Sequence, residues 1–312
     1  MAMGLLAGSA LGADDTTPVE CKSCAAWNAR AEPFRIYEGV YYVGTQGLAS
    51  VLIDTGDELI LLDGGLPQSA LRILANIRDL GFDPRRVRWL VNSHAHFNHA
   101  GGIAALARLT GARVAASGRG ADALRAGMTS DDDPQHDPAN PMRFPVVKEV
   151  RAMSDGEAIV LGRITLTAHL TPGHTPGAVT WTWESCERSG QRCIDFVYAD
   201  SLNPVSASGF RFSDDPARVQ EFETSLRKLQ KLPCDALIPL HTEITGAHGD
   251  GESFIGRDKC EAFITRAHSR WRQRLRDEAA VTGSVQHSRA TPPGEKALSP
   301  SRRRASRDGP RG

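Results

Sequence analysis

The segment His94-Ala-His96-Phe-Asn98-His99 follows directly on an apolar run, residues 87–91, that is typical of a buried β-strand. Residues two apart at the end of an extended strand face the same side, so the rings of His94 and His96 are expected to converge on one point. Asn98 and His99 come where the chain turns away from the strand, and they can face a neighbouring point. The segment therefore predicts two metal ions held side by side.

Two further histidines stand at comparable places in the second half of the chain. His174 lies in the loop sequence Thr171-Pro-Gly-His-Thr-Pro-Gly177, and His241 follows the apolar run 237–240. Imidazole nitrogen is among the usual ligands of zinc, and catalytic zinc sites keep one position open. A single histidine at such a place is ordinarily structural or exposed. Five of them at strand ends and connecting loops indicate a metal centre.

The order of apolar runs predicts two strand-rich halves, each covered by helices. Two such halves favour an α/β architecture with two sheets packed face to face between helical layers. A stretch rich in Asp and Pro, residues 128–145, separates them and is predicted to be a long loop in which Asp131-Asp-Asp133 is solvated. The strands are expected at residues 40–43, 49–53, 58–62, 87–91, 164–170, 179–183, 196–199 and 236–240, and the helices near 71–80, 103–109, 216–229 and 260–278.

The histidine segment and the two later histidines resemble the HxHxDH signature and the later ligands of the metallo-β-lactamase superfamily. The resemblance covers residues 34–278 and implies a four-layer αββα sandwich of two mixed β-sheets flanked by helices. Asp63, in Leu61-Leu-Asp-Gly-Gly65, resembles the family's acidic residue behind the first ligand pair, where it would support catalysis by orienting ligand histidines.

Finer features resemble subclass B3 of these enzymes. No cysteine stands near a ligand, and the segment Tyr198-Ala-Asp200-Ser201-Leu202 occupies the place where other subclasses have a cysteine ligand. Ser201 and Asn203 would contact the substrate carboxylate, although the family usually has Ser at the position of Asn203. The resemblance implies a first zinc ion bound by His94, His96 and His174 and a second bound by Asn98, His99 and His241.

The resemblance also implies a reaction, the hydrolysis of the β-lactam amide bond in penicillins, cephalosporins and carbapenems. A zinc-bound water that ionises near pH ~7 would supply the hydroxide. The expected partner is this small-molecule substrate, the expected state is a monomer, and the expected consequence is antibiotic resistance. No stretch of about 18 apolar residues predicts a membrane span, and nothing in the composition predicts nucleic-acid binding.

Asn98 departs from the family, which has Asp at this position. An amide carbonyl is a neutral and weaker metal ligand than a carboxylate, and the nitrogen end of the amide only donates hydrogen bonds. The second zinc ion is therefore expected to be weakly held. Three outcomes stay open: reduced rates with two ions, function with one ion, or Asp200 acting as a substitute ligand.

The two ends of the chain differ from its centre. Residues 1–13 (MAMGLLAGSALGA) read as the apolar stretch of a secretory signal without its basic start, which predicts a periplasmic or secreted protein. The alternative is a disordered apolar start on a cytosolic protein. Residues 279–312 hold seven Lys and Arg against two Asp and Glu and are rich in Ser, Pro and Gly, so we expect a disordered basic tail.

Six cysteines are consistent with an exported protein that contains disulfides, although reduced thiols are the alternative. By resemblance to subclass B3 we expect the pairs Cys186/Cys193 and Cys234/Cys260. The pairing of Cys21 and Cys24, which form a CxxC sequence, is left open.

Four alternatives compete with a β-lactamase. The same fold carries thioesterases of the glyoxalase II type and lactonases, and its metal motif also serves iron oxygenases. A zinc-binding pseudoenzyme weakened by Asn98 is the non-enzymatic alternative. The signal-like start, the cysteine pairs and the Ser201 segment favour the β-lactamase.

Overall fold

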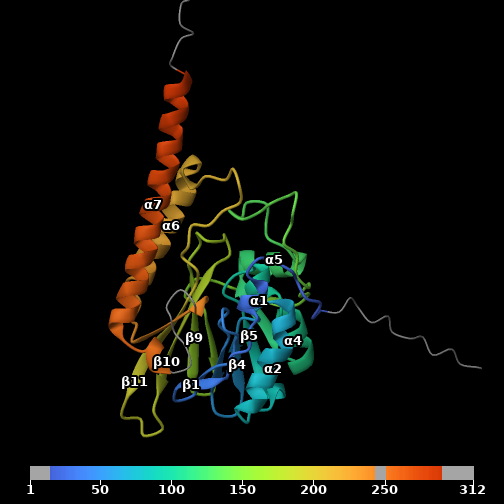
Figure 1. Ribbon diagram of the computed structural model, residues 1–312. Helices are drawn as coiled ribbons and strands as arrows, with labels where there is room; N and C mark the ends of the chain where they lie inside the picture. Colours follow the sequence, from blue (N-terminus) through green and yellow to red (C-terminus); the bar gives the residue numbers. More distant parts are fainter. Residues whose placement is uncertain (1–14, 243–250, 290–312) are drawn as a thin grey trace, which may run out of the picture.

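The computed structural model describes residues 15–242 and 251–289, with side chains to residue 280. Its strands form one sheet of seven strands and one of five, which face each other and carry helices on their outer faces (Figure 1). The fold is the predicted αββα sandwich.

The seven-stranded sheet is mixed. Its first four strands run antiparallel to one another, and the pairs from β4 to β7 are parallel. In spatial order the strands are β1 (Phe34–Tyr37), β2 (Val40–Tyr42), β3 (Val51–Asp54), β4 (Leu59–Leu62), β5 (Val87–Val91), β6 (Arg113–Ser117) and β7 (Val150–Met153).

The five-stranded sheet is also mixed, because only its β11–β12 pair is parallel. In spatial order the strands are β12 (Ala236–Pro239), β11 (Cys193–Ala199), β10 (Val179–Cys186), β9 (Ile164–Leu170) and β8 (Ala158–Leu161).

Helices cover the outer face of each sheet (Figure 1). The first sheet is covered by α2 (Ala70–Asp79), α4 (Ile103–Thr110) and α5 (Gly118–Ala126), and the second by α6 (Pro216–Leu229) and α7 (Arg257–Arg289). Two single-turn helices, α1 (Cys24–Trp27) and α3 (Phe97–Ala100), and the 3-10 turns Pro67–Ser69, Pro84–Arg86, Phe212–Asp214 and Gly251–Phe254 complete the described elements.

Three apolar layers hold the sandwich together, and the side chains of strand β4 pack into two of these layers. Ile60 and Leu62 face the core between the sheets, whereas Leu59 and Leu61 face the core under the helices. Successive side chains of a strand point to opposite faces, so a strand buried on both sides needs an unbroken apolar run.

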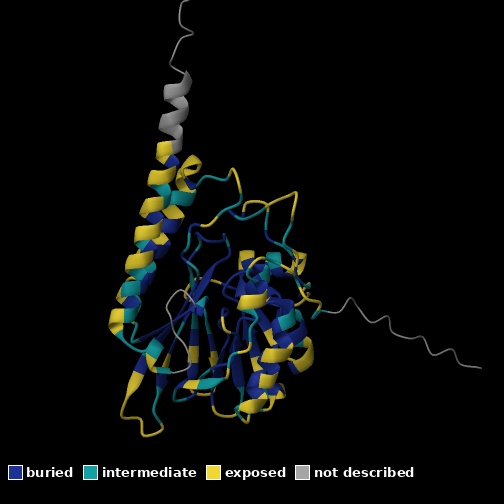
Figure 2. Cartoon of the chain, viewed as in Figure 1, coloured by how far each residue is buried: buried dark blue, intermediate teal, exposed yellow. Residues whose placement is uncertain are grey.

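Helix α6 has the predicted bounds, and its start is marked in the sequence. The Asp215 side chain accepts hydrogen bonds from the backbone of Ala217 and Arg218, and Pro216 occupies the first turn, where its missing N–H costs nothing. The neighbouring α7 buries a stripe of Phe263, Ala267 and Trp271, four residues apart, while its other face is exposed (Figure 2).

All six cysteines are paired, so the alternative of reduced thiols is wrong in this structure. Cys186–Cys193 bridges directly opposed residues of β10 and β11, and Cys234–Cys260 ties the start of β12 to α7. The pairing left open in the sequence is a local Cys21–Cys24 disulfide at the start of α1.

Two predicted boundaries differ from the structure. Helix α7 runs to Arg289, so residues 279–289 are helical and not part of a disordered tail. Ala279 and Ala280 are strong helix formers, and neither Gly nor Pro stands among the first four residues after Glu278. At the other end, Cys24 is buried with Leu48 and Leu66, so the folded unit begins before residue 34.

The signal-like residues 1–13 and the tail from residue 290 lie outside the described residues. Within the described ranges, no helix combines the length and the apolar character that a bilayer span requires.

Removing the Trp271 side chain should destabilise the fold. Its ring is 2% exposed and stacks on Phe222 with a centroid distance of 4.2 Å. We expect Trp271→Ala to lower the free energy of unfolding by roughly 3–5 kcal/mol, and the melting temperature by about 10 °C. Thermal unfolding followed by circular dichroism measures this. The exposed neighbour provides the control, Arg272→Ala, which should stay within about 0.5 kcal/mol, and equal melting of both variants would contradict the packing argument.

Candidate metal centre

The histidine segment follows the C-terminal end of β5, an inner strand of the first sheet, and a close backbone contact holds it there. His96 has extended backbone angles, φ −93° and ψ 151°, and α3 begins at the next residue. The backbone N–H of Gly64 donates to the carbonyl of His99 at 2.9 Å. A Cβ atom on Gly102 would collide with the carbonyl oxygen of Gly64, so glycine at position 102 permits this approach.

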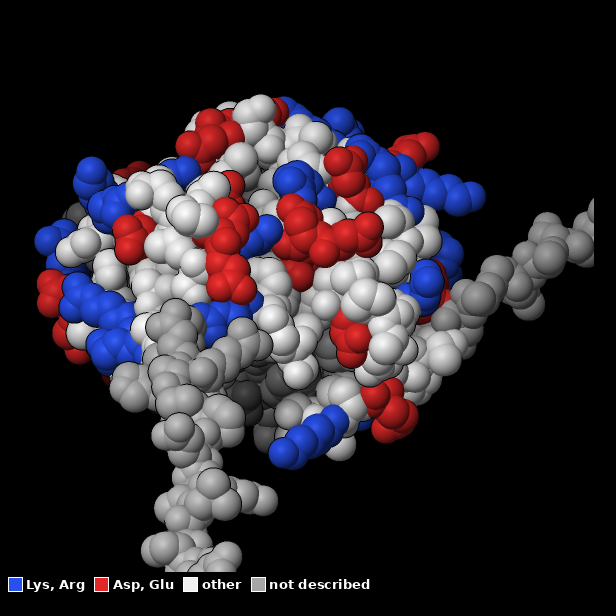
Figure 3. All heavy atoms as spheres, turned by 90° about the horizontal axis from the view of Figure 1, so that it is seen from above, with Lys and Arg blue, Asp and Glu red and all other residues white. Residues whose placement is uncertain are grey.

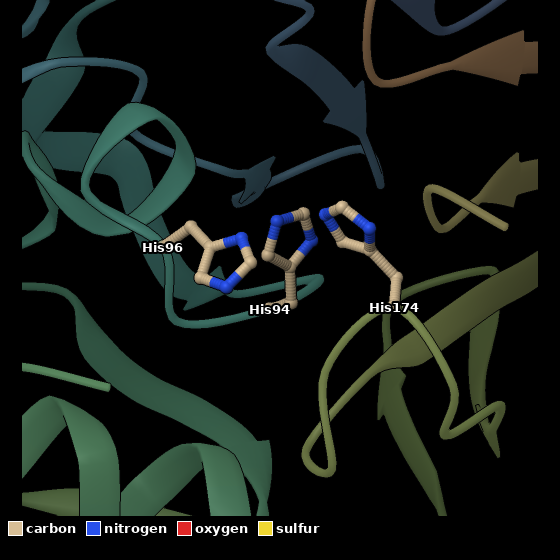
Figure 4. A group of neighbouring side chains, drawn as sticks. All are labelled: His94, His96 and His174. Carbon is tan, nitrogen blue, oxygen red and sulfur yellow. The ribbon is translucent and has the colours of Figure 1, made fainter. Parts of the chain in front are cut away.

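His94, His96 and His174 form the first ligand trio, as predicted. One ring nitrogen from each lies within 4.8 Å of the others. Figure 4 shows the three rings side by side, two from the loop after β5 and the third from the loop after β9.

Each ring of the first trio is oriented by a hydrogen bond at its other nitrogen. His94 Nδ1 lies 2.7 Å from Asp200 Oδ1, and His96 Nε2 lies 3.2 Å from both carboxylate oxygens of Asp133. His174 Nδ1 lies 2.7 Å from the carbonyl oxygen of Asn203. Metal-binding histidines typically have such partners, which fix the tautomer and the direction of the free nitrogen.

The nitrogens that face inward have the chemistry of metal ligands. Burial, reinforced by the neighbouring imidazoles, holds the pKa of His94 well below its ordinary value, and burial lowers the pKa of His174 to about 3. Both rings are therefore neutral at pH 7, the form that binds metal. His94 Nε2 is buried without a hydrogen-bond partner. A buried polar atom of this kind ordinarily has a partner, and a metal ion would supply one.

Asn98, His99 and His241 form a second trio beside the first. Asn98 Nδ2 lies 3.0 Å from His99 Nε2 and 3.3 Å from His241 Nε2, and the two imidazole nitrogens are 3.2 Å apart. The ring centroids of His94 and His99 are only 4.5 Å apart, so the trios are adjacent. Turning the Asn98 amide over exchanges its nitrogen and oxygen, which lets the carbonyl oxygen face an ion here.

Asp63 is placed differently from the prediction. It lies behind Ser93 and His99, with 3.7 Å between its Oδ2 and His99 Nδ1, and not behind the first ligand pair. Its fully buried carboxylate accepts hydrogen bonds from Asn92, Ser93 and Tyr198. Burial raises its pKa to about 6 despite these bonds. Asp63 does not line the cavity, so its role is to position neighbours and not to contact substrate.

Asp200 orients His94 and is not a substitute ligand in this structure. Its Oδ1 faces His94 Nδ1, whereas the ligand nitrogen is on the other side of the ring. The side chain is fully buried, and burial together with the charge of Asp63 raises its pKa well above the ordinary value.

The long loop between α5 and β7 contributes two residues that the sequence did not reveal. Asp131 is exposed as expected, but Asp133 is buried against His96. The Gln135 amide nitrogen lies 3.4 Å from His96 Nδ1 and 3.3 Å from His174 Nε2, so it covers the first trio. Neither residue lies in a periodic pattern, and no short motif marked them.

The trios open into one cavity of about 320 Å³. His96, Asn98, His174 and His241 line its floor, as do Ser201 and Asn203, the predicted substrate contacts. Apolar residues on its walls are Trp27, Phe97, Met142, Leu202 and Phe263. The cavity is of the size and mixed polarity that small-molecule sites typically have.

Comparison with known proteins gives consistent matches. The family model described as the metallo-beta-lactamase superfamily matches residues 44–188. A subclass B3 metallo-β-lactamase described as the first with an active-site glutamic acid is 44% identical, with a TM-score of 0.79 over 86% of this chain and 99% of that one. The Rm3 metallo-β-lactamase is 43% identical, with a TM-score of 0.78 over 84% of this chain and 100% of that one.

A sequence match of a different kind is the hydroxyacylglutathione hydrolase of Anaeromyxobacter dehalogenans. It is 31% identical over 170 residues, which are 54% of this chain and 52% of that protein. The chain thus spans about half the length of this relative, whereas it spans nearly all of the two β-lactamases. Together with the two ligand trios, these matches show that the chain belongs to the metallo-β-lactamase superfamily and has subclass B3 enzymes as structural neighbours.

Proposed function

We propose that this protein is a zinc-dependent β-lactamase that hydrolyses the amide bond of the β-lactam ring. The observation that carries the proposal is the pair of adjacent trios, four of whose six residues line one cavity. Similarity to subclass B3 enzymes along nearly their whole length supports the choice of substrate.

The donor atoms fit zinc. Five imidazoles and one amide are offered, and the described site contains no thiolate. His94, His96 and His174 would hold one ion, and Asn98, His99 and His241 the other. When bound in such a site, zinc lowers the pKa of water toward neutrality and polarises a carbonyl group.

The chain's own residues supply position and shielding. Asp200, Asp133 and the Asn203 carbonyl fix the first trio, so the ligand nitrogens do not need to reorganise when substrate arrives. The apolar walls displace water around a bound ring system, which strengthens polar interactions at the floor. The side chains of Ser201 and Asn203 offer neutral hydrogen bonds to the substrate beside the trios.

A thioesterase of the hydroxyacylglutathione hydrolase type is the second candidate, because a relative of that name shares 31% identity with half of this chain. The β-lactamase is favoured because the two B3 structures match 86% and 84% of this chain and nearly their own whole length. The absence of a membrane-spanning helix in the described ranges and the three disulfides are consistent with an exported, periplasmic or secreted enzyme. A monomer that confers antibiotic resistance stays part of this proposal.

A substrate comparison tests the reaction itself. The purified chain should hydrolyse a chromogenic cephalosporin and a carbapenem faster than S-lactoylglutathione. A chelator should abolish the activity, and added zinc should restore it, because the proposed reaction depends on zinc bound by the two trios. Zinc per chain is measured on the same preparations. Preference for the thioester would move the assignment to the second candidate, and hydrolysis that a chelator leaves unchanged would overturn both.

Asn98→Asp should strengthen the second trio. A carboxylate adds a negative charge at a position 3.0 Å from His99 Nε2, so we expect zinc affinity at the weaker site and turnover to rise by roughly tenfold. Zinc titration and steady-state kinetics measure the two effects. Asn140→Asp, which makes the same change at an exposed loop residue, is the control. Unchanged zinc affinity in Asn98→Asp would show that the amide is not a ligand.

Asp133→Asn should weaken the first trio through His96. The amide keeps the shape of the side chain but removes the charge that faces His96 Nε2. Zinc affinity is expected to fall by about 10- to 100-fold. Asp131→Asn removes a charge two residues away in the same loop, from a side chain that is 98% exposed, and should have no effect. Equal zinc affinities of the two variants would argue against an orienting role of Asp133.

A further inference from the structure

Two arginines on α7 line the same cavity as residues of the two trios. Arg266 and Arg270 are exposed residues one helical turn apart, and both line this cavity together with His241 and Asn203. Residues four apart lie on the same face of a helix, so both guanidinium groups extend from one side.

The backbone that carries these arginines is firmly held. The Cys234–Cys260 disulfide fixes the first turn of α7, and Trp271 stacks on Phe222 of the neighbouring helix. Each arginine comes one residue before a member of the buried stripe, Ala267 or Trp271. They therefore stand at the margin of the buried face, where the helix meets the cavity.

Neither arginine has a charged partner within the described part of the chain. The positions three and four residues away on the helix hold Ala, Phe, Ser, Gln or Arg, and none is acidic. Arg257 and Arg274 of the same helix, by contrast, pair with Asp235 and Glu278. Like charges four residues apart destabilise a helix, so an unpartnered pair at this position indicates a ligand that neutralises it.

The described cavity lining contains no other permanently charged side chain. Neither Asp nor Glu is among the lining residues, and Asp133 and Asp200 lie behind the ligand rings. Elsewhere on this face, acidic and basic side chains are interspersed (Figure 3). The electrostatic potential within the cavity therefore favours an anion near α7.

We infer that Arg266 and Arg270 recognise the substrate's carboxylate and thereby hold the substrate between α7 and the ligand trios. The inference rests on the proposed function and specifies its substrates: the protein prefers cyclic amides that carry a carboxylate over neutral ones. Arginine binds carboxylates through two parallel hydrogen bonds that are stronger than neutral ones. Ser201 and Asn203 offer only neutral groups, and the Asn203 carbonyl is already engaged by His174.

The test compares an acid with its ester. Benzylpenicillin and its methyl ester differ only in the carboxylate, so the ratio of their kcat/KM values reports recognition of this group. Removing both arginines in Arg266→Ala/Arg270→Ala should lower kcat/KM for the acid by about tenfold, mainly through KM, and leave the ester nearly unchanged. The double Lys variant, which keeps both charges, should retain part of the preference.

Arg272→Ala is the matched control, because Arg272 is an exposed arginine of the same helix outside the cavity lining. Its acid-to-ester ratio should equal that of the unchanged protein. Melting curves of all variants establish that each is folded. An unchanged ratio in the double Ala variant would overturn the inference.

Binding to the metal-free protein separates this inference from the proposed reaction. Calorimetric titration with benzylpenicillin needs no hydrolysis and should show binding that weakens about tenfold in the double Ala variant and weakens as salt is added. If the protein hydrolyses no β-lactam but this difference is present, the proposed reaction fails and the anion site stands. Equal binding of the acid to both proteins, or no binding to either, sinks the anion site.

Discussion

Imidazole rings removed from water must find partners for both of their nitrogens, and this requirement organises the centre of the molecule. Four of the five clustered histidines are buried. In the first trio, each outer nitrogen is engaged by the protein, which leaves one nitrogen per ring directed at a shared point. The partners come from two distant parts of the chain, the loop with Asp133 and the residues that follow β11, so the site forms only when both sheets are packed together.

The sandwich provides this arrangement because the ends of strands from both sheets meet at one edge. β5 leads into His94 and His96, the loop after β9 carries His174, and His241 follows β12. The core between the sheets fixes their relative position, and α7 then closes one side of the cavity. The three segments of the chain that carry the two trios are thus held in place by apolar packing, and the polar groups only set the direction of each ring.

Much of this could be predicted from sequence where a local pattern specifies structure. The strand at Val87–Val91 and the helix at Pro216–Leu229 were placed correctly, because one is an apolar run and the other has an Asp cap followed by Pro. The six residues of the two trios were predicted to lie together, since spacing and strand ends mark them, and the structure places them side by side. β1, β6, β7 and β8 were missed because runs of four or five residues are too short to show a distinct period.

The remaining site residues depend on tertiary structure. Asp133 and Gln135 lie in an irregular loop, and only the folded chain brings them to His96. Asp63 was expected behind the first ligand pair but lies behind Ser93 and His99, because a turn with φ +58° directs its carboxylate there. Arg266 and Arg270 look like ordinary exposed helix residues until α7 is placed beside the cavity.

The distribution of carboxylates around the two trios explains why the Asn98 amide is expected to influence metal affinity. All six ligands are neutral when the histidines are neutral, so negative charge reaches the site only from behind the rings. The first trio has Asp133 and Asp200 directly against two of its imidazoles, at 3.2 and 2.7 Å. The second trio has only Asp63, 3.7 Å from His99. A cation in the first trio is therefore balanced by two near carboxylates, and a cation in the second by one that is farther away. Asp at position 98 would restore this balance, whereas with Asn98 we expect the two trios to differ in metal affinity.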